Sequence, residues 1–392
     1  MGSVGAPPAV RRTLVHFIED GDTSGYFPQL ARHHDRERYR VLFATLKPIE
    51  ARLRSFMDEE RIPWFSLDCR SRLSYAAALP KLVRFLRREG VDILHTHLFD
   101  PSVVGLCAGA LAGTPVRIMT RHYSDYHTRI RKAWHVRLDQ LCTRLSTAVI
   151  AVSEHTAEHM VRAEGAPPSK INAIPNGIDF ARVRTSSDEA PARLRREYAP
   201  NGEALLLVPA RLHPEKGHEY VFAALARLRA RADRAVVLLV AGVGPFEDTY
   251  RRRVRELGCE ADVRFLGFRK DLPDLMRAVD LVVVASVAEA FGLVLAEALY
   301  LGACVVASRV GGIPEIVEDG VNGCLVPPAD VGALALAIDE LLNDRGRRER
   351  LARSGRDKVV ARFRFEDMVR SYEALYDRLA PTSCAPVAVH QR

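Results

Sequence analysis

One short segment, residues 281–297, limits the possible folds more than any other. It opens with an apolar run, Leu281 to Ala285, which is typical of a strand buried on both faces of a parallel sheet. A helical pattern follows from about Phe291-Gly292-Leu293. Because a strand that passes through a short loop into a helix is the repeating unit of α/β folds, the segment predicts a parallel sheet covered by helices.

Two carboxylates flank this predicted helix start. Glu289 lies in the loop before it, and Glu297 lies a little over one turn after Gly292, roughly 7.5 Å along the axis. The free N–H groups of a helix N-terminus can hold an anion, and a glycine lets a ligand approach the backbone. The ordinary alternative, one solvated glutamate and one helix-capping glutamate, stays open on this segment alone.

The same alternation of apolar runs and helical patterns fills the rest of the chain. With 392 residues the chain exceeds one typical core, so two domains are expected. We place the junction in residues 181–202, where a Ser- and Pro-containing stretch precedes a charged helix. The predicted parts are a Rossmann-like domain over 1–185, a second one over 203–360, and a C-terminal helix over 361–380 that returns to the first domain. Strands are expected at 13–18, 40–45, 91–96, 116–120, 148–152, 204–208, 236–240, 263–268, 281–285, 304–308 and 323–328, and residues 171–179 are expected to form a strand and a turn.

Composition is that of an ordinary globular protein, with 48% hydrophobic and 27% charged residues. No apolar stretch approaches the length of a membrane span, and the first ten residues lack the pattern of a secretory signal. The seven cysteines show no C-x-x-C spacing, so neither a zinc site nor a disulfide framework is indicated. A cytoplasmic location is therefore expected.

Net charge is +8, and most of the excess lies in residues 1–180, with 25 Lys and Arg against 19 Asp and Glu. Nucleic acid is not expected as a partner, because no strip combines aromatic with basic side chains. A basic helix over 130–146 could lie on an anionic membrane surface, so peripheral membrane contact is possible; a solvated helix face is the ordinary alternative. Its basic residues and those just before it are Arg129, Arg131, Lys132, Arg137 and Arg144.

Histidines gather in the same half of the chain. His95 and His97 fall on one face of the strand over 91–96 and the residue after it. A metal pair is conceivable there, but the sequence shows no third ligand nearby, so we expect no metal. His122 follows the strand over 116–120, at the end of the sheet where α/β proteins bind ligands. A histidine hydrogen-bonded within its loop is the alternative for His122.

Two further loops have the composition of anion sites. Arg211 and Lys216 follow the strand over 204–208, where the forked guanidinium and the ammonium would suit a diphosphate, and a structural ion pair is the alternative. Gly21 and Gly25 follow the first strand and could admit a phosphate or a sugar, or serve as plain turn residues.

Five motifs follow one another along the chain: 174–179 (IPNGID), Arg211-Leu212 with Lys216-Gly217, 242–245 (GVGP), 289–293 (EAFGL) with Glu297, and 311–315 (GGIPE). Taken together, these motifs resemble the retaining glycosyltransferases of family 4, which have the GT-B fold of two Rossmann-like domains facing a central cleft. The order and spacing of the motifs fit that family over roughly residues 13–380. The first loop lacks the adjacent glycine pair common in the family, and Ala285 and Ala210 stand where Pro and Gly are common.

The resemblance implies that the chain moves a hexosyl-type sugar from a nucleoside-diphosphate sugar to a small polar or lipid-linked acceptor. The first domain would bind the acceptor and the second the donor. The family needs no metal and no cofactor, in agreement with the lack of a suitable Asp-x-Asp motif. Alternatives are a GT-B phosphorylase, a pseudo-glycosyltransferase that joins non-sugar rings, and a non-catalytic sugar-nucleotide-binding protein. No particular base, sugar, acceptor or oligomeric state is indicated.

The same resemblance assigns roles to single residues. Arg211 and Lys216 would hold the diphosphate, Glu297 would accept hydrogen bonds from the ribose, and Glu289 would hold sugar hydroxyls or the phosphate. His122 would orient the sugar near its anomeric carbon. The catalytic set is thus His122, Glu289, Arg211 and Lys216. The donor-binding set is Gly25, Arg211, Lys216, Gly244, Phe268, Glu289, Phe291, Gly292, Leu293 and Glu297.

Overall fold

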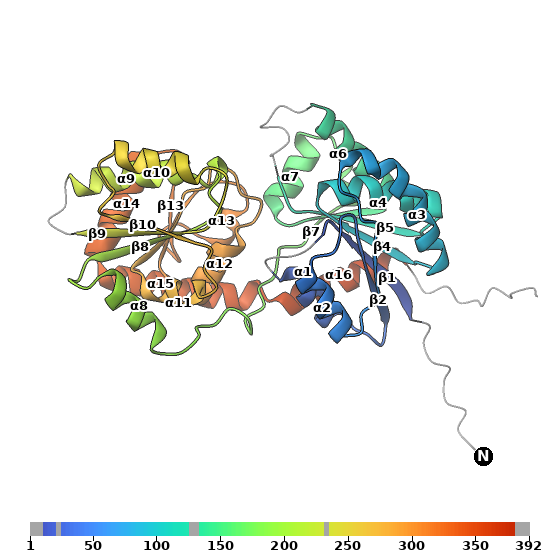
Figure 1. Cartoon of the computed structure of the whole chain (residues 1–392), viewed down its shortest axis with the longest axis horizontal. Coiled ribbons are helices and arrows are strands. Elements are labelled where there is room, and N and C mark those ends of the chain that lie inside the picture. Colours follow the sequence, from blue (N-terminus) through green and yellow to red (C-terminus); the bar gives the residue numbers. More distant parts are fainter. Residues whose placement is uncertain (1–10, 21–24, 125–132, 231–234, 381–392) are drawn as a thin grey trace, which may run out of the picture. The chain divides into compact units, whose positions relative to one another are not determined.

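The computed structural model describes residues 11–20, 25–124, 133–230 and 235–380, which form two compact units (Figure 1). We call unit 1 the residues Met1–Val152, Ala157–Ile174 and Glu366–Arg392, and unit 2 the residues Ser153–Thr156 and Pro175–Phe365. Each unit contains one parallel sheet with helices packed against it. The predicted α/β class, with two Rossmann-like domains, is confirmed.

The sheet of unit 1 has the strand order β3-β2-β1-β4-β5-β6-β7, and all its pairings are parallel. Its order reverses between β1 and β4, the point at which doubly wound sheets bind ligands. Every residue of β4 is buried, as expected for a central strand covered on both faces. The strands are β1 (Arg12–Ile18), β2 (Tyr39–Thr45), β3 (Trp64–Ser66), β4 (Ile93–His97), β5 (Val116–Arg121), β6 (Ala148–Ala151) and β7 (Ile171–Ala173).

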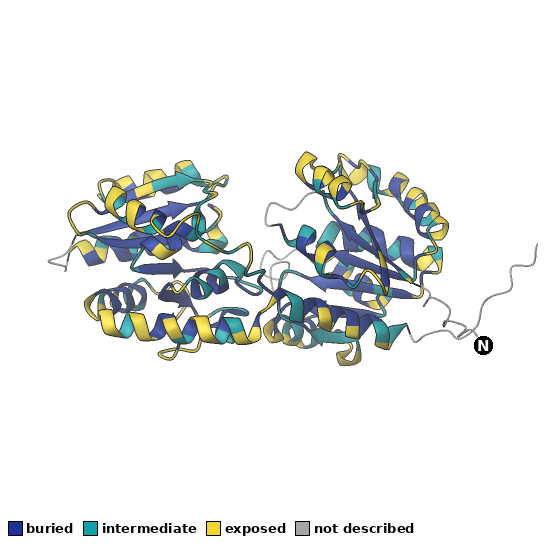
Figure 2. Cartoon of the chain, turned by 90° about the horizontal axis from the view of Figure 1, so that it is seen from below, coloured by how far each residue is buried: buried dark blue, intermediate teal, exposed yellow. Residues whose placement is uncertain are grey.

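The helices of unit 1 bury apolar faces against this sheet (Figure 2). The predicted C-terminal helix exists as α16 (Phe365–Leu379), and within unit 1 its Asp377 accepts hydrogen bonds from Arg12 (2.8 Å) and Tyr39 (2.9 Å). The other helices are α1 (Tyr26–His33), α2 (Ala51–Glu59), α3 (Tyr75–Arg88), α4 (Phe99–Ala112), α6 (Ala133–Leu145) and α7 (Glu154–Arg162). The first residues of α7, up to Thr156, belong to unit 2.

The sheet of unit 2 has the order β10-β9-β8-β11-β12-β13, again parallel, and it reverses between β8 and β11. Its strands are β8 (Ala204–Pro209), β9 (Val236–Ala241), β10 (Val263–Gly267), β11 (Leu281–Val284), β12 (Val305–Ser308) and β13 (Cys324–Val326). Its helices are α8 (Ala190–Tyr198), α9 (His218–Arg229), α10 (Glu247–Glu256), α11 (Leu272–Ala278), α12 (Leu293–Tyr300), α13 (Ile313–Ile316), α14 (Val331–Asn343) and α15 (Arg345–Arg362).

The segment in which the sequence places the domain junction, residues 181–202, lies within the longer stretch of unit 2, Pro175–Phe365. Helix α8 lies in that segment and packs on α11. Its Arg195 forms an ion pair with Asp280 at 3.0 Å, and the same carboxylate accepts a hydrogen bond from the N–H of Leu205 at the start of β8. None of the helices in the described part of the chain is long and apolar enough to cross a bilayer.

Candidate functional site

The loops that follow β8 and β11 meet at the point where the sheet of unit 2 reverses its order. A backbone hydrogen bond joins them, from the N–H of Val287 to the carbonyl of Glu215 at 2.8 Å. Because β8 and β11 are parallel neighbours, both loops leave the same edge of the sheet. The topology therefore brings together the two segments that carry Lys216 and Glu289.

Lys216 and Glu289 form the central contact of this site. The Nζ of Lys216 lies 2.6 Å from Oε2 of Glu289, and the two side chains are only 18% and 17% exposed. The hydroxyl of Ser286 donates to the same oxygen at 3.4 Å. A half-buried ammonium of this kind can exchange its carboxylate for the oxygens of a phosphate or of a sugar ring substituent.

Arg211 does not join that pair. Its guanidinium contacts Glu215 at 2.9 Å, one turn further along the same loop, and its side chain is 73% exposed. The sequence predicts that Arg211 and Lys216 bind a diphosphate together, but in the structure only Lys216 contacts Glu289. To hold a diphosphate, Arg211 would exchange an exposed surface pair, which is worth about 1 kcal/mol or less.

At the start of α12, main-chain groups rather than side chains are accessible to a ligand. Gly292 precedes the helix with φ +105°, and its N-terminal groups have no side-chain cap. The ring of Phe291 is 2% exposed and packs edge-on against Phe363 at 5.5 Å between centroids. Since that ring points into the core, only the main chain of Phe291 and the helix start at Leu293 are offered to a ligand.

Glu297 lies one turn into α12 and is half-buried. Burial raises the pKa of its carboxyl to about 7, and the nearby Arg182 offsets this only in part. Among the described residues, none forms a hydrogen bond with this carboxyl group. A buried acid without a protein partner costs free energy unless something else pairs with it, which is how ligand-binding acids are often found.

Two glycines of the matching motifs hold the loops close together. At Gly311, with φ +54°, a Cβ would come within 1.5 Å of the carbonyl oxygen of Glu289. At Gly244, in the loop after β9, a Cβ would lie 2.4 Å from the carbonyl oxygen of Leu212. Both positions require glycine for backbone packing around the site, whether or not a ligand is bound.

Phe268, the predicted neighbour of a nucleobase, follows β10 and is 66% exposed. The next residue, Arg269, is held by Asp271 through two hydrogen bonds of 2.7 and 2.6 Å and also contacts the hydroxyl of Tyr198 at 3.3 Å. An exposed ring beside a fixed guanidinium is able to stack on a planar base.

His122 and Gly25 belong to unit 1, unlike the residues above. His122 follows β5, and its Nε2 lies 3.2 Å from Nδ1 of His97. Burial lowers the pKa of the His122 imidazole to about 4, so the ring is neutral near pH 7. Gly25 precedes α1 with φ +75°, and Gly21 lies outside the described residues.

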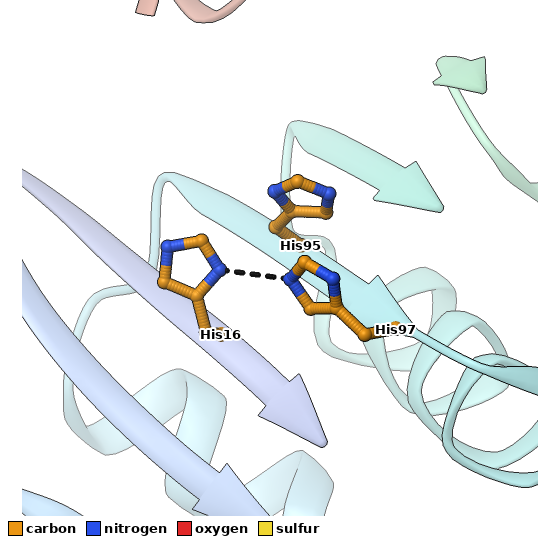
Figure 3. Close-up of side chains that lie close together, drawn as sticks. All are labelled: His16, His95 and His97. Atoms are coloured by element: carbon orange, nitrogen blue, oxygen red, sulfur yellow. Dashed lines mark hydrogen bonds between the residues drawn. The ribbon is translucent and has the colours of Figure 1, made fainter. Parts of the chain in front are cut away.

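The face shared by His95 and His97 is confirmed, with the two rings stacked at 4.2 Å between centroids. Sequence reasoning missed a third histidine, His16 on β1, which pairs opposite His95 in the sheet. Figure 3 shows the three side chains gathered over β1 and β4, with ligand atoms within 4.8 Å of one another. The sequence does show a histidine inside each of two predicted strands. Only the strand order, however, shows that these two strands are neighbours and that their histidines lie together.

The ring nitrogens of these three histidines are already hydrogen-bonded within the protein. His95 contacts the hydroxyls of Tyr376 (2.7 Å) and Thr120 (2.6 Å). His16 contacts His97 and His34, each at 3.0 Å, and His97 contacts His122 as well. A metal ion would have to displace several of these bonds, so the cluster fits a hydrogen-bonded core better than an open metal site.

The basic helix is described only in part. Arg129, Arg131 and Lys132 lie outside the described residues, while Arg137 and Arg144 are on α6. Exposed apolar side chains accompany them on this helix, with Trp134 50% and Leu141 39% exposed.

Two parallel α/β units of this topology define the GT-B class. The solved structure of Alr3699/HepE from Anabaena in complex with UDP superimposes with a TM-score of 0.80 at 25% sequence identity, covering 93% of this chain and 100% of that one. The Anabaena protein was also solved in complex with UDP and glucose, with a TM-score of 0.78 at 26% identity, covering 92% and 98% of the two chains.

Sequence comparisons give the family. The model for Glycosyltransferase Family 4 matches residues 26–182, and the model for Glycosyl transferases group 1 matches residues 192–358. A D-inositol 3-phosphate glycosyltransferase from Corynebacterium efficiens is 30% identical over 329 residues, which cover 79% of this chain and 77% of the relative. An N-acetyl-alpha-D-glucosaminyl L-malate synthase from Bacillus anthracis is 30% identical over 303 residues, 76% of this chain and 78% of that relative. The chain belongs to the group 1 glycosyltransferases, with a first half of the family 4 type.

Proposed function

We propose that this protein is a retaining glycosyltransferase that moves a hexosyl-type sugar from a nucleoside-diphosphate sugar to a polar acceptor, without a metal ion. The observation that carries the proposal is the half-buried contact of 2.6 Å between Lys216 and Glu289, placed between the loop after β8 and the start of α12. It combines a cation, a carboxylate and free helix N–H groups within one unit, which is what a sugar diphosphate requires.

Lys216, Arg211 and the N-terminus of α12 would act on the leaving group. As the bond between the anomeric carbon and the phosphate oxygen breaks, negative charge grows on the diphosphate. Cations and helix N–H groups that are already oriented stabilise that charge more in the transition state than in the bound substrate, and this difference lowers the barrier.

No side chain is assigned as a nucleophile. The acceptor hydroxyl would attack from the face that the diphosphate leaves, so that its oxygen bonds to the anomeric carbon while its proton passes to the departing phosphate oxygen. Glu289 would hold hydroxyls of the sugar once Lys216 has turned to phosphate. His122, neutral at pH 7, would orient the sugar rather than transfer a charge.

Glu297 would bind the ribose. Its carboxyl group is half-buried, has a raised pKa and lacks a hydrogen-bond partner within the described residues, so two hydroxyls would satisfy an otherwise costly group. The donor we propose to test first is a uridine diphosphate sugar, since the Anabaena protein was solved with UDP-glucose bound. For the acceptor, the names of the relatives favour a small polar compound with an anionic group, consistent with the basic first half.

Calorimetric titration of the full chain with UDP, GDP, ADP and TDP tests the donor site. We expect one diphosphate, UDP first, to bind at micromolar concentration; binding by none of the four would overturn the assignment. Arg211→Ala should weaken that binding, whereas Arg251→Ala should not. Arg251 is the matched control because it forms the same kind of exposed pair, with Glu247 at 2.7 Å, on α10.

A GT-B phosphorylase or a pseudo-glycosyltransferase would use a similar charged set. Release of a free sugar phosphate that depends on added inorganic phosphate would favour the phosphorylase, and coupling of a non-sugar ring would favour the pseudo-glycosyltransferase. A non-catalytic sugar-nucleotide-binding protein would bind the diphosphate but turn over no acceptor.

Peripheral contact with an anionic membrane, and with it a lipid-linked acceptor, is proposed on a surface of unit 1. An open groove along α3 and the end of α4 combines apolar and basic side chains, as an interfacial surface does. Sedimentation with anionic vesicles at low and high salt should show binding that salt weakens, and no such binding would remove this part of the proposal. The lining residues are Leu79, Pro80, Val83, Arg84, Arg87, Arg88 and Leu111.

A further inference from the structure

A continuous line of hydrogen bonds, buried except at its partly buried His122 end, runs through unit 1 from α16 to His122. Oε1 of Glu373 lies 3.0 Å from Nδ1 of His34, and Nε2 of His34 lies 3.0 Å from Nε2 of His16. Nδ1 of His16 lies 3.0 Å from Nε2 of His97, and Nδ1 of His97 lies 3.2 Å from Nε2 of His122. We call these residues the histidine chain; every contact in it falls within unit 1.

The histidine chain allows only two arrangements of protons while its rings are neutral. A neutral imidazole has one N–H donor and one acceptor nitrogen, so each ring that donates on one side must accept on the other. The choice made at one end therefore fixes the tautomer of every ring to the other end. Neutral rings are expected here, because burial lowers the pKa values of His16, His34 and His97 as well as that of His122.

Glu373 decides between the two arrangements. Its Oε1 also accepts the backbone N–H of Asp35 at 2.9 Å, and its Oε2 lies 3.7 Å from the guanidinium of Arg38. A carboxylate that takes a hydrogen bond from an N–H group and pairs with a cation acts as an acceptor only. His34 must then donate from Nδ1, and in turn His16, His97 and His122 each donate from Nε2.

We propose that Glu373, His34, His16 and His97 are positioning residues that hold His122 as the Nε2–H tautomer and so keep a lone pair on its Nδ1. This inference rests on the proposed role of His122 in orienting the donor sugar. Nδ1 has no hydrogen-bond partner within the described part of the chain. It would therefore accept a hydrogen bond from a sugar hydroxyl, and it could not donate one to a ring or phosphate oxygen.

His95 stands beside the histidine chain without belonging to it. It stacks on His97, but its two nitrogens are engaged by Tyr376 and Thr120. Its hydroxyl partners can each donate or accept, so its tautomer does not depend on Glu373. His95 thus serves as an internal reference in any measurement of the tautomers.

The test is a long-range proton–nitrogen NMR spectrum of the full chain labelled with 15N-histidine, with His122 assigned by comparison with His122→Asn. We expect Nδ1 of His122 to be the unprotonated, pyridine-type nitrogen and Nε2 the protonated one. A protonated Nδ1 in the wild-type protein overturns the proposal, and this spectrum needs no substrate. Failure of the glycosyltransferase assignment would leave the result untouched, so the two hypotheses fail separately.

Two variants test whether the hydrogen bonds of the histidine chain set the tautomer of His122. Glu373→Met removes the selecting carboxylate, and His16→Phe interrupts the histidine chain at its middle. Each should replace the single pyridine-type Nδ1 resonance of His122 by a mixture of both tautomers. Asp377→Leu is the matched control, since it removes a carboxylate from α16 that contacts Arg12, Arg38 and Tyr39 but no histidine of the chain.

Three results would contradict the proposal even with a correct wild-type spectrum. His122 could keep its single tautomer in both variants, in which case the chain does not set it. Asp377→Leu could disturb it as much as Glu373→Met, which would show a general loss of packing. Metal analysis of the purified protein could find one zinc per chain that is lost in His16→Phe; the three clustered histidines would then be ligands instead of hydrogen-bond partners.

Discussion

Lys216 and Glu289 are separated by 73 residues in the chain, yet their charged atoms lie 2.6 Å apart in unit 2. The contact exists because β8 and β11 are neighbours in the sheet, although two strands, β9 and β10, lie between them in the sequence. In the absence of a ligand, each group satisfies the other. Under the proposed function, a bound diphosphate would take over Lys216 and release Glu289 for the sugar, so the pair would connect donor binding with sugar recognition.

The two partners should therefore respond differently to truncation. Lys216→Ala removes a charge-assisted contact worth about 1.5–3 kcal/mol, so the affinity for UDP should fall about 10- to 100-fold. Glu289→Ala frees the ammonium from a competing carboxylate and should leave UDP affinity unchanged or higher, while sugar transfer is lost. Calorimetry with UDP and turnover with UDP-glucose measure the two effects. An equal loss of UDP affinity in both variants would show that the pair acts only as a structural ion pair.

Glu297→Gln should change how the stability of unit 2 depends on pH. The carboxyl pKa is raised from 4.5 to about 7 by burial, so the folded state binds the proton more tightly than the unfolded state. The stabilisation that the protonated Glu297 carboxyl gives to the folded state is fully present below about pH 4.5 and is lost as the pH rises through 7. This loss lowers the free energy of unfolding by about 1–3 kcal/mol. The variant should lack this loss between pH 5 and 8. Urea unfolding followed by circular dichroism measures it, and an identical pH slope in both proteins would contradict the raised pKa.

Much of the fold could be predicted from local patterns of apolar and polar residues in the sequence. A central parallel strand is covered on both faces, so each of its residues must be apolar. The strand therefore shows in the sequence as a continuous apolar run, such as Leu281 to Ala285. The three-residue strand β3 was not predicted, since an edge strand this short has no period to detect. Helix α8 was assigned to a junction because its surface is highly charged, although it packs on α11.

The candidate site could be predicted only in part, because its contacts join segments that are far apart in the chain. Glu289 and Lys216 were found because each sits in a motif at a strand end. Their direct contact, the Glu215 partner of Arg211 and the approach of His16 to His97 all depend on strand order and side-chain direction. Local sequence does not specify these, because they arise where segments far apart in the chain pack together.

Gly311→Ala should disturb the site through the backbone. The added Cβ would meet the carbonyl oxygen of Glu289 at 1.5 Å, so one of the two loops must move. Gly320→Ala is a matched control within unit 2, since Gly320 also has a positive φ of +74° but nothing within 4 Å of the added atom. The control should cost about 1–2 kcal/mol for its backbone conformation alone. Gly311→Ala should cost more and should also weaken UDP binding, and equal effects on unfolding and on UDP affinity would refute the clash.

The histidine chain should make unit 1 sensitive to acid. Burial lowers the pKa values of its four histidines below the usual 6.5, to about 4 for His122, so the unfolded chain binds more protons than the folded one in that interval. The stabilising effect of these neutral rings is present above about pH 6.5 and is lost as the pH falls toward 4. His16→Phe removes one such ring and should flatten the dependence, whereas His155→Phe, at an exposed position of unit 2, should not. Both tryptophans, Trp64 and Trp134, lie in unit 1, so the midpoint of urea unfolding by tryptophan fluorescence at pH 4.5, 5.5 and 7.5 reports on this unit directly. Equal slopes in His16→Phe and the wild type would show that the buried rings do not control acid stability.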